Sequence, residues 1–245
     1  MTGVVTPRDG ATIMLVRDGD QGPRPLEVFM LQRHPSTAFG SVHVFPGGVV
    51  DEADRGDAIA AWAPGRSDAD ASAELGLDRG GLAFWIAALR EAFEEAGVLL
   101  ARTSDGRVLE LDDPATAERF EAHRRALHAG DVTFAAVLEA ESLTLAVDEV
   151  RYWSHWITPA SEPKRFDTRF FVAPAPAGHT YAHDDVELIG SGWVRPADAL
   201  DALRAGRFPM IMPTIATLEE LDHGTVDRLF DAHRTSLADV PRGPR

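Results

Sequence analysis

The chain has 245 residues, 44% of them hydrophobic and 26% charged, which is typical of a globular protein that can build its own core. Its formal net charge of −15 argues against non-specific binding to nucleic acid or to an anionic membrane surface. The lack of cysteine excludes disulfides, thiolate catalysis and cysteine-bound zinc.

No apolar stretch reaches the roughly 18 residues that a membrane-spanning helix needs, and the first residues lack the apolar run of a signal peptide. We therefore expect a cytoplasmic protein. Because no linker rich in proline, glycine and serine divides the chain, we expect one domain over residues 1–245.

Alternating apolar residues predict strands at residues 12–18 and 26–33, and residues 41–51 predict a strand, a Pro-Gly-Gly turn and a short extended piece. An insertion at about residues 55–81 is expected to hold one or two short helices. Residues 82–100 show apolar positions at helical spacing, and Gly97 is placed to end that helix.

The second half of the chain predicts more helices and three further strands. Two helices are expected in a helical insertion at about residues 112–141, followed by strands at 150–158, 168–176 and 186–194. A helix at 197–206 and a pair of helices in a C-terminal extension at about 207–238 end the pattern. Strands interleaved with helices favour a mixed sheet covered by helices, which is an α/β fold.

The stretch REAFEEAG, residues 90–97, places Glu91, Glu94 and Glu95 on one face of its helix. Like charges at this spacing cost a few tenths of a kcal/mol per pair, so a solvated acidic face is the plain interpretation. The opposite face is strongly apolar, however, which fixes the direction of the carboxylates. Three carboxylates in one place suit a hard cation such as Mg²⁺ or Mn²⁺, which would convert their repulsion into coordination.

Upstream, the stretch FPGGVVDEAD contains two glycines, Gly47 and Gly48, where a backbone can approach a ligand closely. Together the two stretches resemble the Nudix box of the Nudix hydrolases: Gly48, five residues, the acid Asp54, and later the run from Arg90 to Val98. The family usually has glutamate in place of Asp54. Between Asp54 and Arg90 lie 35 residues (90 − 54 − 1) where the family has seven, so this box carries an insertion of 28.

A box split in this way resembles a narrower branch, the coenzyme A and acyl-CoA diphosphatases of the mammalian peroxisomal type. The segments 31–55, REAFEEAGVLL, WSHWITP and RFDTRFF share this resemblance. It implies a Nudix fold, an α/β/α sandwich with a mixed sheet, and Mg²⁺- or Mn²⁺-dependent hydrolysis of CoA or acyl-CoA. The products would be 3′,5′-ADP and 4′-phosphopantetheine or its acyl form.

Two alternatives stay open at this point. One is a Nudix pyrophosphatase acting on ADP-ribose, NADH or another nucleotide diphosphate. The other is a Nudix-fold module that binds a ligand without turnover, although such modules usually lose carboxylates that this chain keeps. In each case the partner is a small molecule rather than nucleic acid or a membrane, and the insertion or the terminal helices could form a homodimer interface.

The resemblance also assigns roles within the box. Glu94 and Glu95 become the main metal ligands, Glu91 the third carboxylate, and the carbonyl of Gly48 a further ligand. Arg90 is expected to pair with a box carboxylate and to orient it rather than to bind substrate. Two glycines, Gly47 and Gly97, support the structure.

Members of the family often take one more acid from a later loop as a metal ligand or general base. Glu187 is the candidate here, with Asp184 and Asp185 as near alternatives. The cations expected near the substrate phosphates, each of which could also be an ordinary surface residue, are Arg33, Lys164, Arg165 and Arg169.

Overall fold

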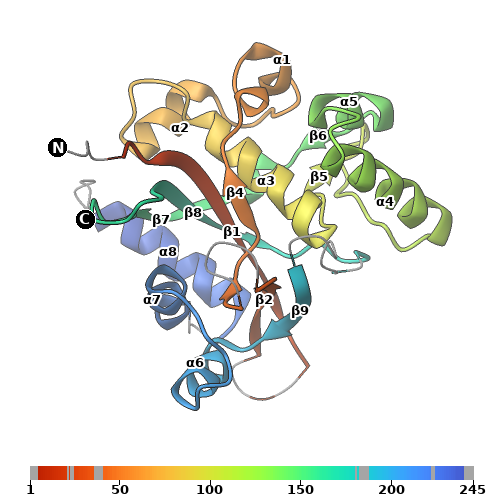
Figure 1. The fold of residues 1–245 in the computed structure, drawn as a ribbon. Coiled ribbons are helices and arrows are strands. Elements are labelled where there is room, and N and C mark those ends of the chain that lie inside the picture. The colour runs from red at the N-terminus through yellow and green to blue at the C-terminus, as the bar shows by residue number, and fades with distance from the viewer. Residues whose placement is uncertain are drawn as a thin grey trace.

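The computed structural model describes residues 5–20, 22, 25–35, 41–179, 181, 188–221 and 224–239. A seven-stranded mixed sheet forms its centre (Figure 1). Its strands are β1 (Arg8–Asp18), β2 (Leu26–Arg33), β3 (His43–Val44), β4 (Gly47–Val49), β7 (Arg151–Ile157), β8 (Phe166–Pro174) and β9 (Leu188–Val194). Within the described residues, no helix is long and apolar enough to cross a bilayer.

The sheet splits at its middle. Strand β1 pairs with β8 in parallel along most of its length, and β7 continues the sheet antiparallel to β8. On its other side β1 pairs with β4 through residues 10–12 and with β2 through residues 16–18. The chain passes from β3, which pairs with β2, to β4, which pairs with β1, within the two residues Phe45 and Pro46. This crossing places β4 at the split.

Helices cover both faces of the sheet. Alternate residues of β1 point to opposite sides, so Ile13 and Leu15 belong to one core cluster and Met14 and Val16 to the other. The first face is covered by α3 (Leu82–Ala96) together with α1 (Asp57–Ala60), α2 (Asp68–Leu75), α4 (Pro114–His128) and α5 (Phe134–Glu141). The second face is covered by α6 (Pro196–Arg204), α7 (Met212–Glu220) and α8 (Val226–Asp239). The predicted α/β/α sandwich is thereby confirmed.

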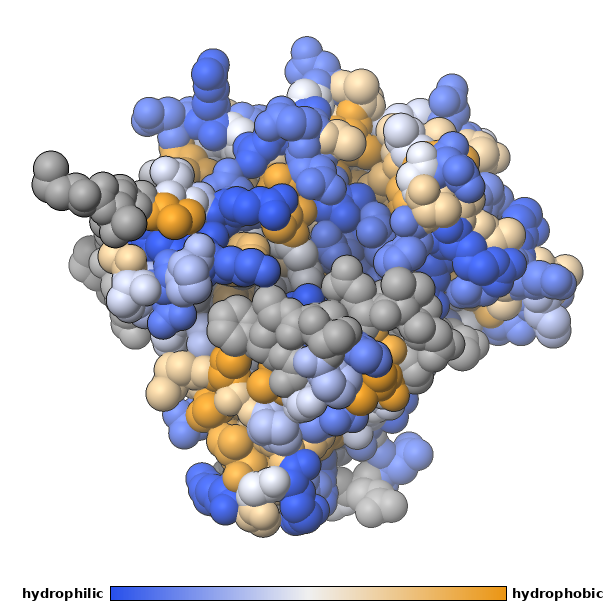
Figure 2. Space-filling model, viewed as in Figure 1, coloured by the Kyte–Doolittle hydropathy of each residue, from blue (hydrophilic) through white to orange (hydrophobic). Residues whose placement is uncertain are grey.

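The surface differs between these two groups of helices. In Figure 2 hydrophilic residues dominate the upper part of the view, over α1, α2 and α4, while hydrophobic residues gather lower down, around α6, α7 and β9. Two of the most exposed large hydrophobic side chains, Ile189 of β9 and Met212 of α7, belong to those lower elements.

Helix α3 is the most deeply buried helix of the first face, with every residue from Leu82 to Phe93 buried. Its start is capped by the preceding insertion: the Asp68 carboxylate accepts from the N–H groups of Gly80 and Leu82, at 2.9 and 3.0 Å. Its end is closed by Gly97, which has a left-handed φ of 69°. The predicted helix and its predicted end are both confirmed.

Two local features differ from the prediction. Gly47 and Gly48 do not form a turn, because they belong to β4 and pair with β1. A Cβ atom on Gly47 would lie 2.6 Å from the carbonyl oxygen of Ala11, so glycine is what allows the two strands to approach. A second sheet, formed by β5 (Ala101–Arg102) and β6 (Thr144–Leu145), was not predicted, since two-residue strands show no alternation.

Trp85 of α3 anchors the helix to the sheet. It is fully buried, its ring centroid lies 4.7 Å from that of Phe171 in β8, and its Nε1 donates to the carbonyl of Val150 at 3.2 Å. We expect Trp85→Ala to lower the free energy of unfolding by about 3–5 kcal/mol in urea titrations, because it leaves a large cavity. Met212→Ala, at an exposed position, should change it by less than about 0.5 kcal/mol.

Candidate active site

Arg90 lies at the centre of the site and is only 6% exposed. Its Nε and Nη2 donate to the two carboxylate oxygens of Asp54, at 2.8 and 2.9 Å. This two-pronged geometry is the strongest that arginine forms with a carboxylate. Asp54 ends a short 3₁₀ helix (Glu52–Asp54) just after β4, so the fork joins two parts of the box that the insertion separates.

The same guanidinium also contacts the glutamates of α3. Nη1 donates to Glu91 at 2.9 Å and to Glu94 at 3.2 Å, and Nη2 donates to the carbonyl of Val49 at 2.9 Å. These bonds, with the two to Asp54, engage all five N–H donors of an arginine. Arg90 therefore orients carboxylates and has no donor left over for a substrate phosphate.

The charges around Arg90 keep it ionised. Burial lowers the pKa of Arg90, but the hydrogen bond to Asp54 and the charges of Glu91, Asp54 and Glu94 outweigh that effect, so the net shift of the pKa is upward. A permanently charged guanidinium holds one oxygen of Glu91 and one of Glu94 against the same nitrogen. Two of the three helix carboxylates are thus brought together.

The third carboxylate, Glu95, is oriented by the backbone of β4. The N–H of Gly47 donates to an oxygen of Glu95 at 2.8 Å. Two residues before and two residues after Gly48, at residues 46 and 50, backbone hydrogen bonds of 2.9 and 3.0 Å join the β4 segment to β1. Because hydrogen-bonded and non-hydrogen-bonded pairs alternate in an antiparallel ladder, Gly48 faces β1 and the backbone groups of Gly47 face away from it.

Glu91 packs directly against Gly48. A Cβ atom at Gly48 would collide with the Glu91 carboxylate, so the glycine makes room for that group. Burial raises the pKa of Glu91 to about 7; Arg90 lowers that pKa and the neighbouring charge of Glu94 raises it.

The donor atoms and charges fit a hard divalent cation. Asp54 and the three helix glutamates supply four carboxylates against the single guanidinium of Arg90, a formal excess of −3 when all are ionised (4 − 1). Carboxylate oxygens are the ligands such cations prefer. Among the described residues, no three acidic or histidine side chains already stand in an arrangement that would hold an ion.

Two of the expected phosphate-binding cations lie away from the Gly47 end of the site, where Glu95 is held. Lys164 is exposed, and Arg165 donates to the carbonyls of Thr158 and Val5 at 3.0 and 2.7 Å. Both precede β8, whose first residue is paired with Arg8, four residues before the β1 position opposite Gly47. At about 3.3 Å per residue this separation is roughly 13 Å along the strand.

The remaining candidates lie in three places. Arg33 ends β2 and is joined through its backbone to Val42, beside the split of the sheet. Arg169 is buried under α3, with its guanidinium 5.0 Å from the ring centroid of Phe84. Glu187 and its alternatives Asp184 and Asp185 lie outside the described residues.

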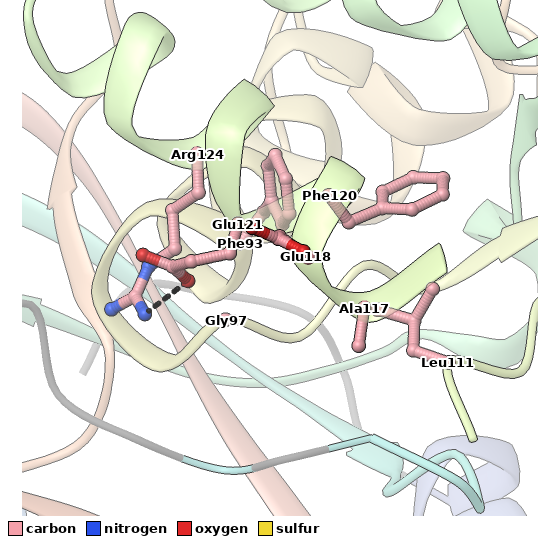
Figure 3. A pocket seen from close by; sticks show the side chains of 8 residues that line it. All are labelled: Phe93, Gly97, Leu111, Ala117, Glu118, Phe120, Glu121 and Arg124. Atoms are coloured by element: carbon pink, nitrogen blue, oxygen red, sulfur yellow. Dashed lines mark hydrogen bonds and ion pairs between the residues drawn. The ribbon is translucent and has the colours of Figure 1, made fainter. Parts of the chain in front are cut away.

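A pocket of about 260 Å³ opens between the end of α3 and α4 (Figure 3). Its lining residues are Phe93, Gly97, Leu111, Ala117, Glu118, Phe120, Glu121 and Arg124. The three helix glutamates are not among them, so the pocket is separate from the carboxylate cluster. Arg124 belongs to no motif recognised in the sequence, and only the packing of α4 against α3 shows its place.

Comparison with known proteins agrees with this geometry. Residues 68–221 match the model of the NUDT19 Nudix domain, which amounts to 154 of the 245 residues (221 − 68 + 1). This chain belongs to the Nudix hydrolase family. A Nudix hydrolase structure from Alicyclobacillus acidocaldarius has a TM-score of 0.72 and 25% identity, covering 99% of this chain and 100% of that one.

Curated relatives point to the NUDT19 branch of the family. The human protein named acyl-coenzyme A diphosphatase NUDT19 is 30% identical over 257 aligned residues, covering 90% of this chain and 67% of its own. The chicken (Gallus gallus) protein of the same name is 28% identical over 272, covering 94% and 71%. A Caenorhabditis elegans relative is 30% identical over 195, covering 79% of this chain and 55% of its own. The chain thus spans 55–71% of the length of these relatives.

We expect Asp54→Asn to destabilise the protein by about 3–5 kcal/mol, because it breaks a buried ion pair and sets an amide N–H group against an N–H donor of the Arg90 guanidinium. Urea unfolding measures this change. Asp78→Asn, at an exposed position of the insertion that follows Asp54, is the control and should leave stability unchanged. Equal midpoints for the two variants would show that the fork contributes nothing to folding.

Proposed function

We propose that this Nudix hydrolase cleaves the diphosphate bond of CoA or acyl-CoA with Mg²⁺ or Mn²⁺, releasing 3′,5′-ADP and 4′-phosphopantetheine or its acyl form. The observation that carries the chemistry is the group of three glutamates held by Arg90 and Gly47. The choice of substrate rests on the relatives named acyl-coenzyme A diphosphatase.

The metal would be held by Glu91, Glu94 and Glu95 together with a backbone carbonyl of the Gly47–Gly48 pair. Gly47 is the better source of that carbonyl, because Gly48 faces the ladder with β1. When bound, the cation would neutralise phosphate oxygens and activate the attacking water.

The chain's own contribution is to position these groups. The N–H of Gly47 orients Glu95, and the guanidinium of Arg90 holds Glu91 and Glu94. Because Arg90 and Glu91 are almost fully buried, the inner side of the site is shielded from water. The carboxylates of the site are therefore preorganised before the substrate binds.

Two further roles complete the proposal. Glu187 remains the candidate for an additional ligand or general base. Arg33 is the candidate for a phosphate contact, since it ends β2 beside β3, from which the chain reaches Gly47 within two residues. A homodimer and a cytoplasmic location remain predictions of the sequence.

A panel of CoA, an acyl-CoA, ADP-ribose and NADH, each with Mg²⁺ or Mn²⁺, tests the substrate. We expect turnover of CoA or acyl-CoA with release of 3′,5′-ADP, and loss of all activity when EDTA removes the metal. Faster hydrolysis of ADP-ribose or NADH would replace the CoA assignment by the nucleotide pyrophosphatase alternative. Activity that survives EDTA would overturn the metal requirement.

We expect Glu95→Gln to lower turnover by roughly 100-fold or more, since a direct ligand should matter at least as much as the outer-shell partners whose loss costs about 10–100-fold. The thermal midpoint should stay near that of the unchanged protein. Glu219→Gln, on an exposed position of α7, is the control and should keep full activity. Normal turnover in Glu95→Gln would remove this residue from the mechanism.

A further inference from the structure

Arg124 reaches from α4 to the end of the helix that bears the glutamates. Arg124 is only 6% exposed, and such deep burial is rare for an arginine. Nε donates to the carbonyl of Glu94 at 2.8 Å and Nη2 donates to the carbonyl of Glu95 at 3.1 Å. Nη1 donates to the carboxylate of Glu121 at 3.3 Å, an interaction drawn in Figure 3.

The two carbonyls that Arg124 binds are ones the helix cannot satisfy itself. The last carbonyls of a helix have no intrahelical partner. Around Gly97 the backbone satisfies the first of them, since the N–H of Gly97 donates to Phe93; the N–H of Val98 donates one residue earlier, to Ala92. The next two carbonyls along the chain are those of Glu94 and Glu95, and Arg124 takes both.

The carboxyl end of α3 is also electrostatically unfavourable unless a cation lies beside it. The carboxyl end of a helix carries a partial negative charge, and two glutamates there add to it. The last turn of α3 contains no basic residue of its own. Arg124 therefore supplies, from a different helix, the positive charge that this helix end lacks.

We propose that Arg124 is a positioning residue for metal binding, which fixes the last turn of α3 so that Glu94 and Glu95 present their carboxylates correctly. This inference rests on the proposed function, in which those two residues are metal ligands. The proposal gives the helical segment at residues 112–141 a role in the reaction, because its helix α4 carries Arg124.

A purely structural clamp is the competing explanation, and Asp68 provides the comparison. Asp68 caps the opposite end of α3, about 20 Å from Glu95 at 1.5 Å per residue. Removing either clamp should lower the thermal midpoint. Only the loss of Arg124 should disturb the metal ligands.

The test measures Mn²⁺ affinity by calorimetry without substrate, kcat and the thermal midpoint for Arg124→Gln, Arg124→Lys and Asp68→Asn. We expect Arg124→Gln to weaken Mn²⁺ binding and to lower kcat, each by about 10-fold, as is typical for residues that orient metal ligands. Arg124→Lys keeps the positive charge but loses the two-pronged guanidinium, so its Mn²⁺ affinity and kcat should lie between those of Arg124→Gln and the unchanged protein. Asp68→Asn should bind Mn²⁺ normally. Arg125→Gln, whose side chain is 65% exposed on the same helix, should match the unchanged protein.

Normal Mn²⁺ affinity and kcat in Arg124→Gln, with a lowered thermal midpoint, would overturn the proposal and leave a structural clamp. Equal weakening of Mn²⁺ binding in Asp68→Asn would do the same. If Arg124→Gln does not fold, Arg124→Lys decides by the same measurements. Glu95→Gln distinguishes failure of the proposed metal site from failure of the proposed role of Arg124. If Glu95→Gln binds Mn²⁺ normally, the proposed metal site itself fails, whatever the Arg124 variants show.

Discussion

The arrangement of the site depends on one buried guanidinium. Arg90 makes five hydrogen bonds to three parts of the chain: Asp54, the carbonyl of Val49 at the end of β4, and two glutamates of its own helix. Without this cation, neighbouring carboxylates would face one another in a buried place, which is costly. The same contacts hold α3 against β4, so the charge balance and the placement of the helix have a common cause.

Both ends of the glutamate-bearing helix are held by side chains from inserted segments. Asp68, in the insertion that splits the box, accepts hydrogen bonds at the start of α3, and Arg124 donates hydrogen bonds at its end. A long loop costs little extra free energy for its length, so the 28 additional residues need not weaken the box. Here they also satisfy backbone groups that a helix leaves open. The insertion thus helps to hold the start of the helix that bears the glutamates.

Local signals in the sequence predicted the main elements well, because they depend on neighbours in the chain. The apolar spacing of α3 and its end at Gly97 were predicted correctly, as was the sandwich of helices around a mixed sheet. The predicted turn at Gly47 and Gly48 was wrong, because Gly47 allows the approach of β1, a strand some 35 residues earlier (47 − 12), and Gly48 makes room for the Glu91 carboxylate. The sequence pattern alone does not distinguish these two uses of glycine.

The sequence by itself determined the α/β type of fold and the three carboxylates that share one helical face, since these follow from residue type and short spacing, and its resemblance to the Nudix box indicated the family. Only the tertiary structure decided which residues surround those carboxylates. It joined Asp54 to Arg90 across the insertion, turned the backbone of Gly47 towards Glu95, and placed Lys164 and Arg165 before β8, four residues along β1 from the position opposite Gly47. It also brought Arg124 to the helix end. The physical reason is that hydrogen bonds and ion pairs act between groups that folding brings within about 3 Å, whatever their separation along the chain.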